Sequence, residues 1–216
     1  MPSATPQPGE EIITKFTNCL LLNPADLTLT NSDLWVSSLT GRILSPQILF
    51  YAIHRIPDQI IDLGGRILSP GLIDVQLNGA FGFNFSSIPP NPQEYGKLLR
   101  QVNKRLVETG VTSYLPTLTS SPKEVYEQAL PFLGPSGAER IASDGAESLG
   151  AHVEGPFISP SKNGIHPISA LQTAPHGFTS LEMLYGPSNH QPHSLSRWHS
   201  PPTTHPQNHR RARNPL

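Results

Sequence analysis

An alternation of strand and helix patterns from Arg66 to about Gly186 constrains the fold of this chain more than any other feature. Residues 72–77 form an apolar run of strand length, and residues 92–110 keep one apolar face at helical spacing. Repeated strand–helix–strand units imply parallel strands joined by right-handed crossovers. The sequence therefore predicts an α/β protein whose sheet is either closed into a barrel or doubly wound.

Two more strands and two more helices continue this alternation. The strands are expected at residues 111–118 and 148–153, and the helices from Ser121 onward and at residues 178–185. We expect Ser121 to cap the first of these helices, because Pro122 suits the first helical position and Glu124 completes a capping box.

The chain before this unit has a different pattern, with short β-rich runs separated by turn residues. Strands are expected at residues 12–16, 19–22, 33–36, 47–53 and 60–63. Residues 11–65 are therefore predicted to form a small β-sandwich domain in front of the α/β unit at residues 66–186. Residues 1–10 are polar and proline-rich, and we expect them to be disordered.

From Pro187 the sequence loses all periodicity. Histidines interleave there with prolines, without a helical or strand-like repeat; they are His190, His193, His199, His205 and His209. Histidine-rich tracts can bind metal, but these residues lack the spacing on a helix that would fix a geometry. Residues 187–216 are therefore predicted to form a disordered tail, and the abrupt change also fits a reading-frame shift or a mis-predicted splice junction.

Charge and composition restrict the partners of this chain. The 15 basic and 16 acidic residues give a formal net charge of -1, which argues against a nucleic-acid footprint or an anionic-membrane patch and favours a small-molecule partner. The single cysteine, Cys19, excludes a disulfide within the chain. Because no apolar stretch approaches the ~18 residues of a membrane span and the N-terminus lacks signal-peptide features, we expect a cytoplasmic protein.

Polar side chains occur where each predicted strand of the α/β unit ends. In a barrel built from such units, active-site groups lie at the carboxyl ends of the strands. These ends carry Gln76 and Asn78, then Thr117 and Thr119, and finally Glu154. The alternative is that strand ends simply become polar as they reach solvent, and position alone does not decide between the two interpretations.

Glu154 and His166 are the strongest candidates for chemistry. Glu154 stands between a strand and Gly155-Pro156, a stiff turn whose glycine lets a ligand come close. A carboxylate is a good ligand for a divalent ion, although a single glutamate is more commonly a capping or surface group. His166 lies in a downstream loop that could fold back over the site, although a lone loop histidine is more often an ordinary surface residue.

Three motifs resemble the N-acetylglucosamine-6-phosphate deacetylases of the amidohydrolase superfamily. They are GGRILSPGLIDVQLNG at residues 64–79, HVEGPFIS at 152–159 and KNGIHP at 162–167, and they occur in the order of that family. Most members of the superfamily carry a His-x-His pair where this chain has Gln76-Leu77-Asn78. That difference argues against a binuclear site of the dihydroorotase or urease type.

This resemblance implies a small β domain beside a (β/α)8 barrel, of which the chain would contain the first three or so βα units. It also implies one divalent metal ion at the mouth of the barrel, with zinc as the first choice and iron, cobalt or manganese as alternatives. Glu154 would be a metal ligand, and Gln76 and Asn78 would lie near the metal. Ile165, through its backbone, and His166 would bind the sugar phosphate.

The reaction implied by the resemblance is hydrolysis of the acetamide of N-acetylglucosamine 6-phosphate to glucosamine 6-phosphate and acetate. In the family, a catalytic Asp and two histidine metal ligands come from later strands, beyond the matching region. No catalytic residue is therefore expected here, and we expect the chain to be inactive or nearly so and poorly suited to a family-like homodimer. The alternatives are a non-catalytic remnant or regulator that binds sugar phosphate or a full-length relative, and an amidohydrolase with another amide substrate.

Overall fold

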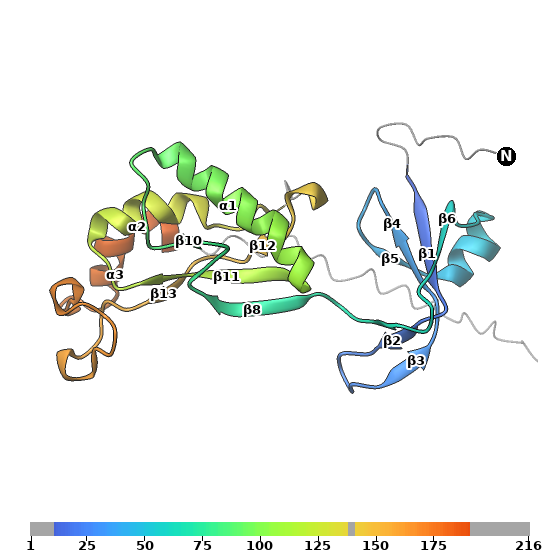
Figure 1. The fold of residues 1–216 in the computed structure, drawn as a ribbon, viewed down its shortest axis with the longest axis horizontal. Coiled ribbons are helices and arrows are strands. Elements are labelled where there is room, and N and C mark those ends of the chain that lie inside the picture. The colour runs from blue at the N-terminus through green and yellow to red at the C-terminus, as the bar shows by residue number, and fades with distance from the viewer. Residues whose placement is uncertain (1–10, 138–140, 191–216) are drawn as a thin grey trace, which may run out of the picture. The chain divides into compact units, whose positions relative to one another are not determined.

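The computed structural model describes residues 11–137 and 141–190 (Figure 1). The chain divides into two compact units, Met1–Leu72 and Ile73–Leu216, and has a mixed α/β fold. The sequence predicts a boundary after residue 65, whereas β7 (Ile67–Leu68) pairs in parallel with β2 (Leu20–Leu22). This pairing places the segment up to Leu72 with the N-terminal strands.

The described residues of the first unit, from residue 11 onward, form two small sheets. One has the strand order β5-β4-β1-β6 and the other β3-β2-β7. The remaining strands of this unit are β1 (Ile13–Thr17), β3 (Leu29–Asn31), β4 (Leu34–Ser37), β5 (Ile43–Leu44) and β6 (Gln59–Asp62). Strand β1 pairs antiparallel with β4 and parallel with β6, and its Ile13 packs with Trp35 and Leu49 in a small core.

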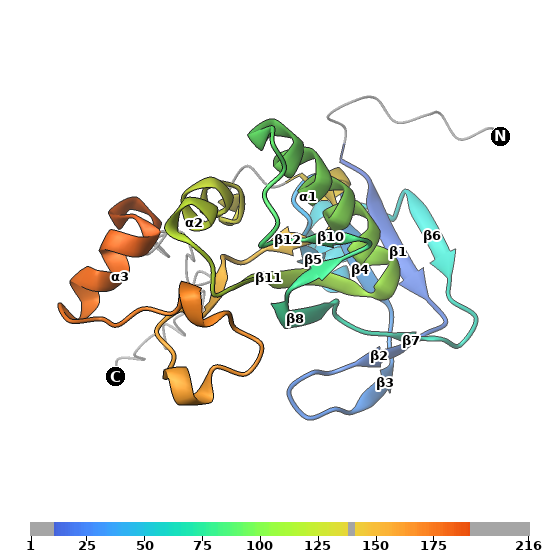
Figure 2. The same ribbon diagram turned by 60° about the vertical axis from the view of Figure 1, so that its left-hand side comes forward.

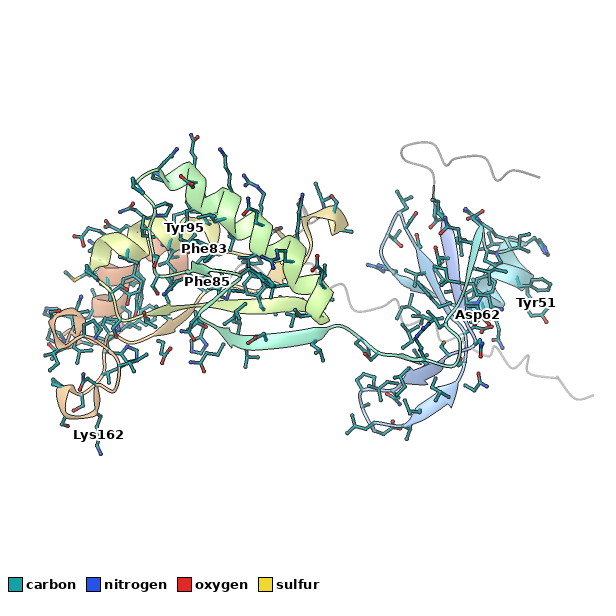
Figure 3. All side chains as sticks on the ribbon, in the orientation of Figure 1. Tyr51, Asp62, Phe83, Phe85, Tyr95 and Lys162 are labelled. Atoms are coloured by element: carbon teal, nitrogen blue, oxygen red, sulfur yellow. The ribbon has the colours of Figure 1, made fainter. Side chains whose placement is uncertain are left out.

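The strand predicted at residues 47–53 is wrong, because Ile48–Ile53 form a short π-helix, η1. This helix ends at His54, which has a left-handed conformation and donates its backbone N–H to the carbonyl of Leu49. Only Leu49 of the helix is buried, and Figure 3 shows Tyr51 pointing away from the ribbon. A short apolar run has no periodicity that separates a strand from a single helical segment, which explains the error.

The second unit is built on a sheet centred on β11 (Val111–Thr119). Strand β11 pairs in parallel with β12 (Glu147–Ser148) and with β13 (His152–Glu154), and β8 (Leu72–Leu77) also pairs with it. A two-stranded hairpin of β9 (Gly79–Ala80) and β10 (Phe83–Asn84) follows β8. The strand predicted at residues 148–153 is therefore two short strands, separated at Gly150, whose φ of 119° interrupts the extended backbone.

Within the described residues, three α-helices accompany this sheet. They are α1 (Pro92–Leu106), α2 (Lys123–Ala129) and α3 (Phe178–Tyr185), with short 3-10 helices at Val107–Thr109 (η2), Leu130–Phe132 (η3), Ala142–Asp144 (η5), Pro160–Lys162 (η6), Ile168–Ala170 (η7) and Pro187–His190 (η8). Helices α1 and α2 lie on the same face of the sheet in both views (Figures 1 and 2). None of the helices in the described residues combines the length and the apolar character needed to cross a membrane.

Helix α1 begins and ends as its sequence predicts. Pro92 is its first residue, and the side chain of Asn91 accepts a hydrogen bond from the backbone N–H of Gln93. The helix continues as the 3-10 turn η2 and stops at Gly110, which has the left-handed conformation (φ 86°) expected of a C-terminal glycine. Its buried face, including Tyr95 and Leu99, packs against the sheet.

Helix α2 begins differently from the prediction. Pro122, and not Ser121, occupies the N-cap position, and no side chain caps the helix. The hydroxyl of Ser121 instead donates a hydrogen bond of 2.9 Å to the carbonyl oxygen of Thr119 at the end of β11. The capping-box prediction is therefore wrong, because the hydroxyl of Ser121 donates its hydrogen bond to the end of β11 and does not cap the helix.

The core of the second unit lies between the sheet and the helices and is rich in aromatic residues. Figure 3 shows Phe83, Phe85 and Tyr95 together below α1, and their rings meet edge to face at centroid distances of 5.1–5.7 Å. The ring of Tyr114, from β11, stacks on Phe85 at 6.0 Å. These contacts pack α1 against β11.

The start of the predicted disordered tail is ordered. Asn189 donates its backbone N–H to Gly186 at 3.1 Å and its side-chain amide to the carbonyl of Tyr185 at 2.6 Å. These bonds continue from α3 into the 3-10 helix η8, so the prediction of disorder is wrong for the four residues Pro187–His190. The rest of the predicted tail, residues 191–216, and the segment 1–10 lie outside the described residues.

Candidate functional site

The polar residues predicted at the strand ends share one face of the sheet. Leu77, Leu118 and Val153 pack into the core beneath the helices. Because successive residues of a strand point to opposite faces, their neighbours point away from the helices. Those neighbours are Gln76 and Asn78 of the β8 end, Thr117 and Thr119 of β11, and His152 and Glu154 of β13. Strand alternation therefore gathers candidate residues from three separate stretches of sequence.

Glu154 is the centre of this group. Its Oε2 atom accepts hydrogen bonds from the side-chain amides of Gln76 and Asn78, each at 3.3 Å. The pairing of β11 with β13 sets Thr119 beside Glu154. Both amide bonds are longer than the usual ~3.0 Å, so they orient the carboxylate without holding it tightly.

His166 reaches the same carboxylate from the loop after β13. Its Nε2 atom lies 3.4 Å from Oε1 of Glu154, and its residue is only 7% exposed. The backbone N–H of Ser120 donates a hydrogen bond of 3.3 Å to Nδ1 of His166. A neutral imidazole that accepts at Nδ1 carries its proton on Nε2, so the ring presents a donor to Glu154. This loop histidine is therefore buried beside Glu154 and is not an exposed surface residue.

The loop holds His166 through its own backbone. Asn163 donates its side-chain amide to the carbonyl of His166 at 2.8 Å, and the N–H of His166 donates to the carbonyl of Asn163 at 2.9 Å. The side chain of Ile165, next to it, is 87% exposed. Lys162 lies farther out on the same loop (Figure 3). The turn thus buries the histidine and leaves its neighbour facing solvent.

These residues supply too few ligands for a complete metal site. Within residues 11–137 and 141–190, no three or more side chains of His, Cys, Asp or Glu come together so that they could hold a metal ion. Glu154 and His166 provide one carboxylate and one imidazole, whereas a catalytic zinc site takes three protein ligands. The described residues therefore form at most one part of a metal centre.

Sequence reasoning did not assign three further residues of this region. Ser86 accepts the backbone N–H of Thr119 at 3.0 Å, and His152 places Nδ1 3.0 Å from the carbonyl oxygen of Val75. The buried hydroxyl of Ser120 has no hydrogen-bond partner among the described residues. Only His152 had a usable signal, since it stands two residues before Glu154 and so shares its face.

Gly155 closely constrains the backbone after Glu154. Its φ is 82°, and a Cβ atom there would collide with the hydroxyl of Ser120 and lie 3.0 Å from the side chain of Ile158. Only glycine combines this conformation with this close approach. The turn after Glu154 therefore packs directly on the turn after β11.

Comparisons with known proteins give consistent results. No protein-family model matches the chain. The chain is 43% identical over 176 residues to the N-acetylglucosamine-6-phosphate deacetylase of Rattus norvegicus and 43% identical over 176 residues to that of Caenorhabditis elegans. Each match covers 81% of this chain, but only 41% of the rat protein and 40% of the nematode protein. The chain thus spans about two fifths of the length of these relatives.

A solved structure has a similar fold. The crystal structure of N-acetylglucosamine-6-phosphate deacetylase from Pasteurella multocida matches with a TM-score of 0.55 and 27% sequence identity. The match covers 79% of this chain and 41% of that chain. Sequence and structure therefore point to the same group of proteins.

Proposed function

Because the chain belongs to the N-acetylglucosamine-6-phosphate deacetylase family, we propose that it forms one part of the site for the reaction after which these relatives are named. The reaction is hydrolysis of the acetamide of N-acetylglucosamine 6-phosphate to glucosamine 6-phosphate and acetate. The observation that carries this proposal is the convergence of Gln76, Asn78 and His166 on Glu154, in a chain with this ancestry.

In this proposal the sheet of β8, β11 and β13 with its helices is part of a (β/α)8 barrel, and its strand ends line the barrel mouth. The likeness in fold to the Pasteurella multocida enzyme supports this assignment. Glu154 would be one ligand of a divalent metal, with zinc as the first choice and iron, cobalt or manganese as alternatives. A carboxylate oxygen suits each of these ions.

The substrate contacts in this proposal come from the loop after β13. When the sugar phosphate is bound, the Nε2–H of His166 would donate a hydrogen bond to it, and the backbone of Ile165 would make a second contact. The support is geometric, because His166 is oriented by Ser120 and stands at the carboxylate. Gln76 and Asn78 would orient Glu154 through their amides.

A second candidate function is binding of the sugar phosphate without hydrolysis. The observation that favours it is the ligand set, since the described residues supply one carboxylate and one imidazole near each other. Imidazole ligands normally provide much of the affinity of a catalytic zinc site. Both candidates share the substrate and differ only in turnover.

We expect no acetate release above background when the purified chain is incubated with N-acetylglucosamine 6-phosphate and Zn²⁺. The reason is the incomplete ligand set of the described residues. Acetate would be measured by a coupled assay, with Glu154→Gln as the comparison. Turnover by the unaltered chain that disappears in Glu154→Gln would show that the metal site is complete and would overturn the binding-only candidate.

A further inference from the structure

Two buried tyrosines that the proposed site does not use hold the backbone on which it stands. The hydroxyl of Tyr126, from α2, accepts the N–H of Ser121 at 3.0 Å and donates to the carbonyl of Thr119 at 3.2 Å. These two residues flank Ser120, whose N–H orients His166. Tyr126 therefore stabilises the turn after β11 through hydrogen bonds on both sides of Ser120.

Tyr185, the last residue of α3, does the same for the turn after β13. Its hydroxyl donates 2.8 Å to the carbonyl oxygen of Gly155, the residue that follows Glu154. Its ring meets the ring of Tyr126 edge to face at 5.1 Å and that of Phe157 at 6.2 Å. The two tyrosines thus contact each other, and each is hydrogen-bonded to the backbone at the end of a different strand.

The hydroxyls of both tyrosines remain donors at neutral pH. Burial raises the pKa of Tyr126 and of Tyr185 above the ordinary value of 10.0. Both rings are almost completely buried, so water does not compete for these hydrogen bonds. Ionisation of the hydroxyls therefore does not break the link between the two turns at neutral pH.

We propose that Tyr126 and Tyr185 are positioning residues that set the spacing between Glu154 and His166. Tyr126 acts through the Ser120 turn on the histidine, and Tyr185 acts through the carbonyl of Gly155 on the glutamate. Neither hydroxyl touches the candidate ligand-binding atoms. The importance of this spacing for sugar-phosphate binding rests on the proposed function, whereas the positioning itself does not.

The test replaces one hydroxyl and leaves the ring in place. Tyr185→Phe removes the bond to Gly155 and keeps the contact with Tyr126. The matched control is Tyr114→Phe. It removes the hydroxyl of another buried tyrosine, which donates a hydrogen bond of 2.6 Å to Oδ1 of Asn103. Tyr114 lies on β11, away from the carboxyl end of that strand. Both variants lose one hydrogen bond of the same unit, and urea unfolding of each records the stability lost.

The measurement is the NMR spectrum of the site in the full chain without ligand. In Tyr185→Phe we expect the side-chain amide signals of Gln76 and Asn78 and the ring signals of His166 to shift. In Tyr114→Phe we expect the signals of Gln76, Asn78 and His166 to keep their wild-type positions. This should hold even if both variants unfold at the same urea concentration, below that of the wild type. Tyr126→Phe should shift the His166 ring signals in the same way.

Two results would overturn the positioning role. One is a set of Gln76, Asn78 and His166 signals in Tyr185→Phe that coincides with the wild type. The other is an equal shift of these signals in Tyr114→Phe, which would indicate a general effect of lost stability. A separate titration of the wild type with N-acetylglucosamine 6-phosphate distinguishes the two proposals, since absence of binding there contradicts the proposed function and leaves the positioning result intact.

Discussion

Replacing Gly155 with alanine is expected to destabilise the second unit by about 3 kcal/mol. A side chain at a φ of 82° costs about 1–2 kcal/mol. The collision of the new Cβ with the hydroxyl of Ser120 adds an overpacking cost of about 1–3 kcal/mol, because the side chain of Ser120 is buried. The free energy of unfolding, measured by urea denaturation, checks this expectation.

Two further variants separate the conformational cost from the collision. Gly164→Ala places a side chain at a φ of 55° where no atom lies within 4 Å, so it should cost only about 1–2 kcal/mol. Adding Ser120→Ala to Gly155→Ala removes the colliding hydroxyl and should restore part of the lost stability. Equal unfolding free energies for Gly155→Ala and Gly164→Ala would contradict the close packing of the two turns.

Replacing His166 with alanine is expected to weaken binding of N-acetylglucosamine 6-phosphate by roughly 10- to 100-fold. The ring would lose a hydrogen bond to a charged group, which is worth about 1.5–3 kcal/mol. The Kd would be measured by isothermal titration calorimetry with Zn²⁺ present. Far-UV circular dichroism of the variant verifies that the unit remains folded after removal of a buried ring.

His176→Ala is the matched control for this change. His176 is an exposed histidine of the same unit, and it lines a shallow groove with Lys123 and Ser180, away from Glu154. We expect its Kd to equal that of the wild type. A similar loss of affinity in both variants, or no loss in His166→Ala, would remove His166 from the binding site.

The sequence predicts helix α1 well because its signals are local. Pro92 and Gly110 mark its ends, and one buried apolar face repeats along it. The short π-helix η1 and the split at Gly150 were missed because each involves only a few residues. Short elements carry too little periodicity to be identified without their neighbours.

The candidate site was predictable to the extent that strand alternation determines it. Gln76, Asn78 and Glu154 meet because each stands at a strand end and faces away from the helices. No sequence pattern predicts the burial of His166, because a loop residue has no periodicity. The contributions of Ser120 and Tyr185 run through backbone atoms, an N–H and a carbonyl acceptor, which the pattern of side chains does not show.

We propose that Gln76, Asn78, Glu154 and His166 form the corner of the protein that binds the amino-sugar phosphate. NMR shift mapping during titration with N-acetylglucosamine 6-phosphate tests this proposal. We expect saturable shifts concentrated at these four residues and at the backbone N–H of Ser120. Shifts confined to other surfaces, such as the groove at Lys123 and His176, or no saturable shifts at all, would contradict it.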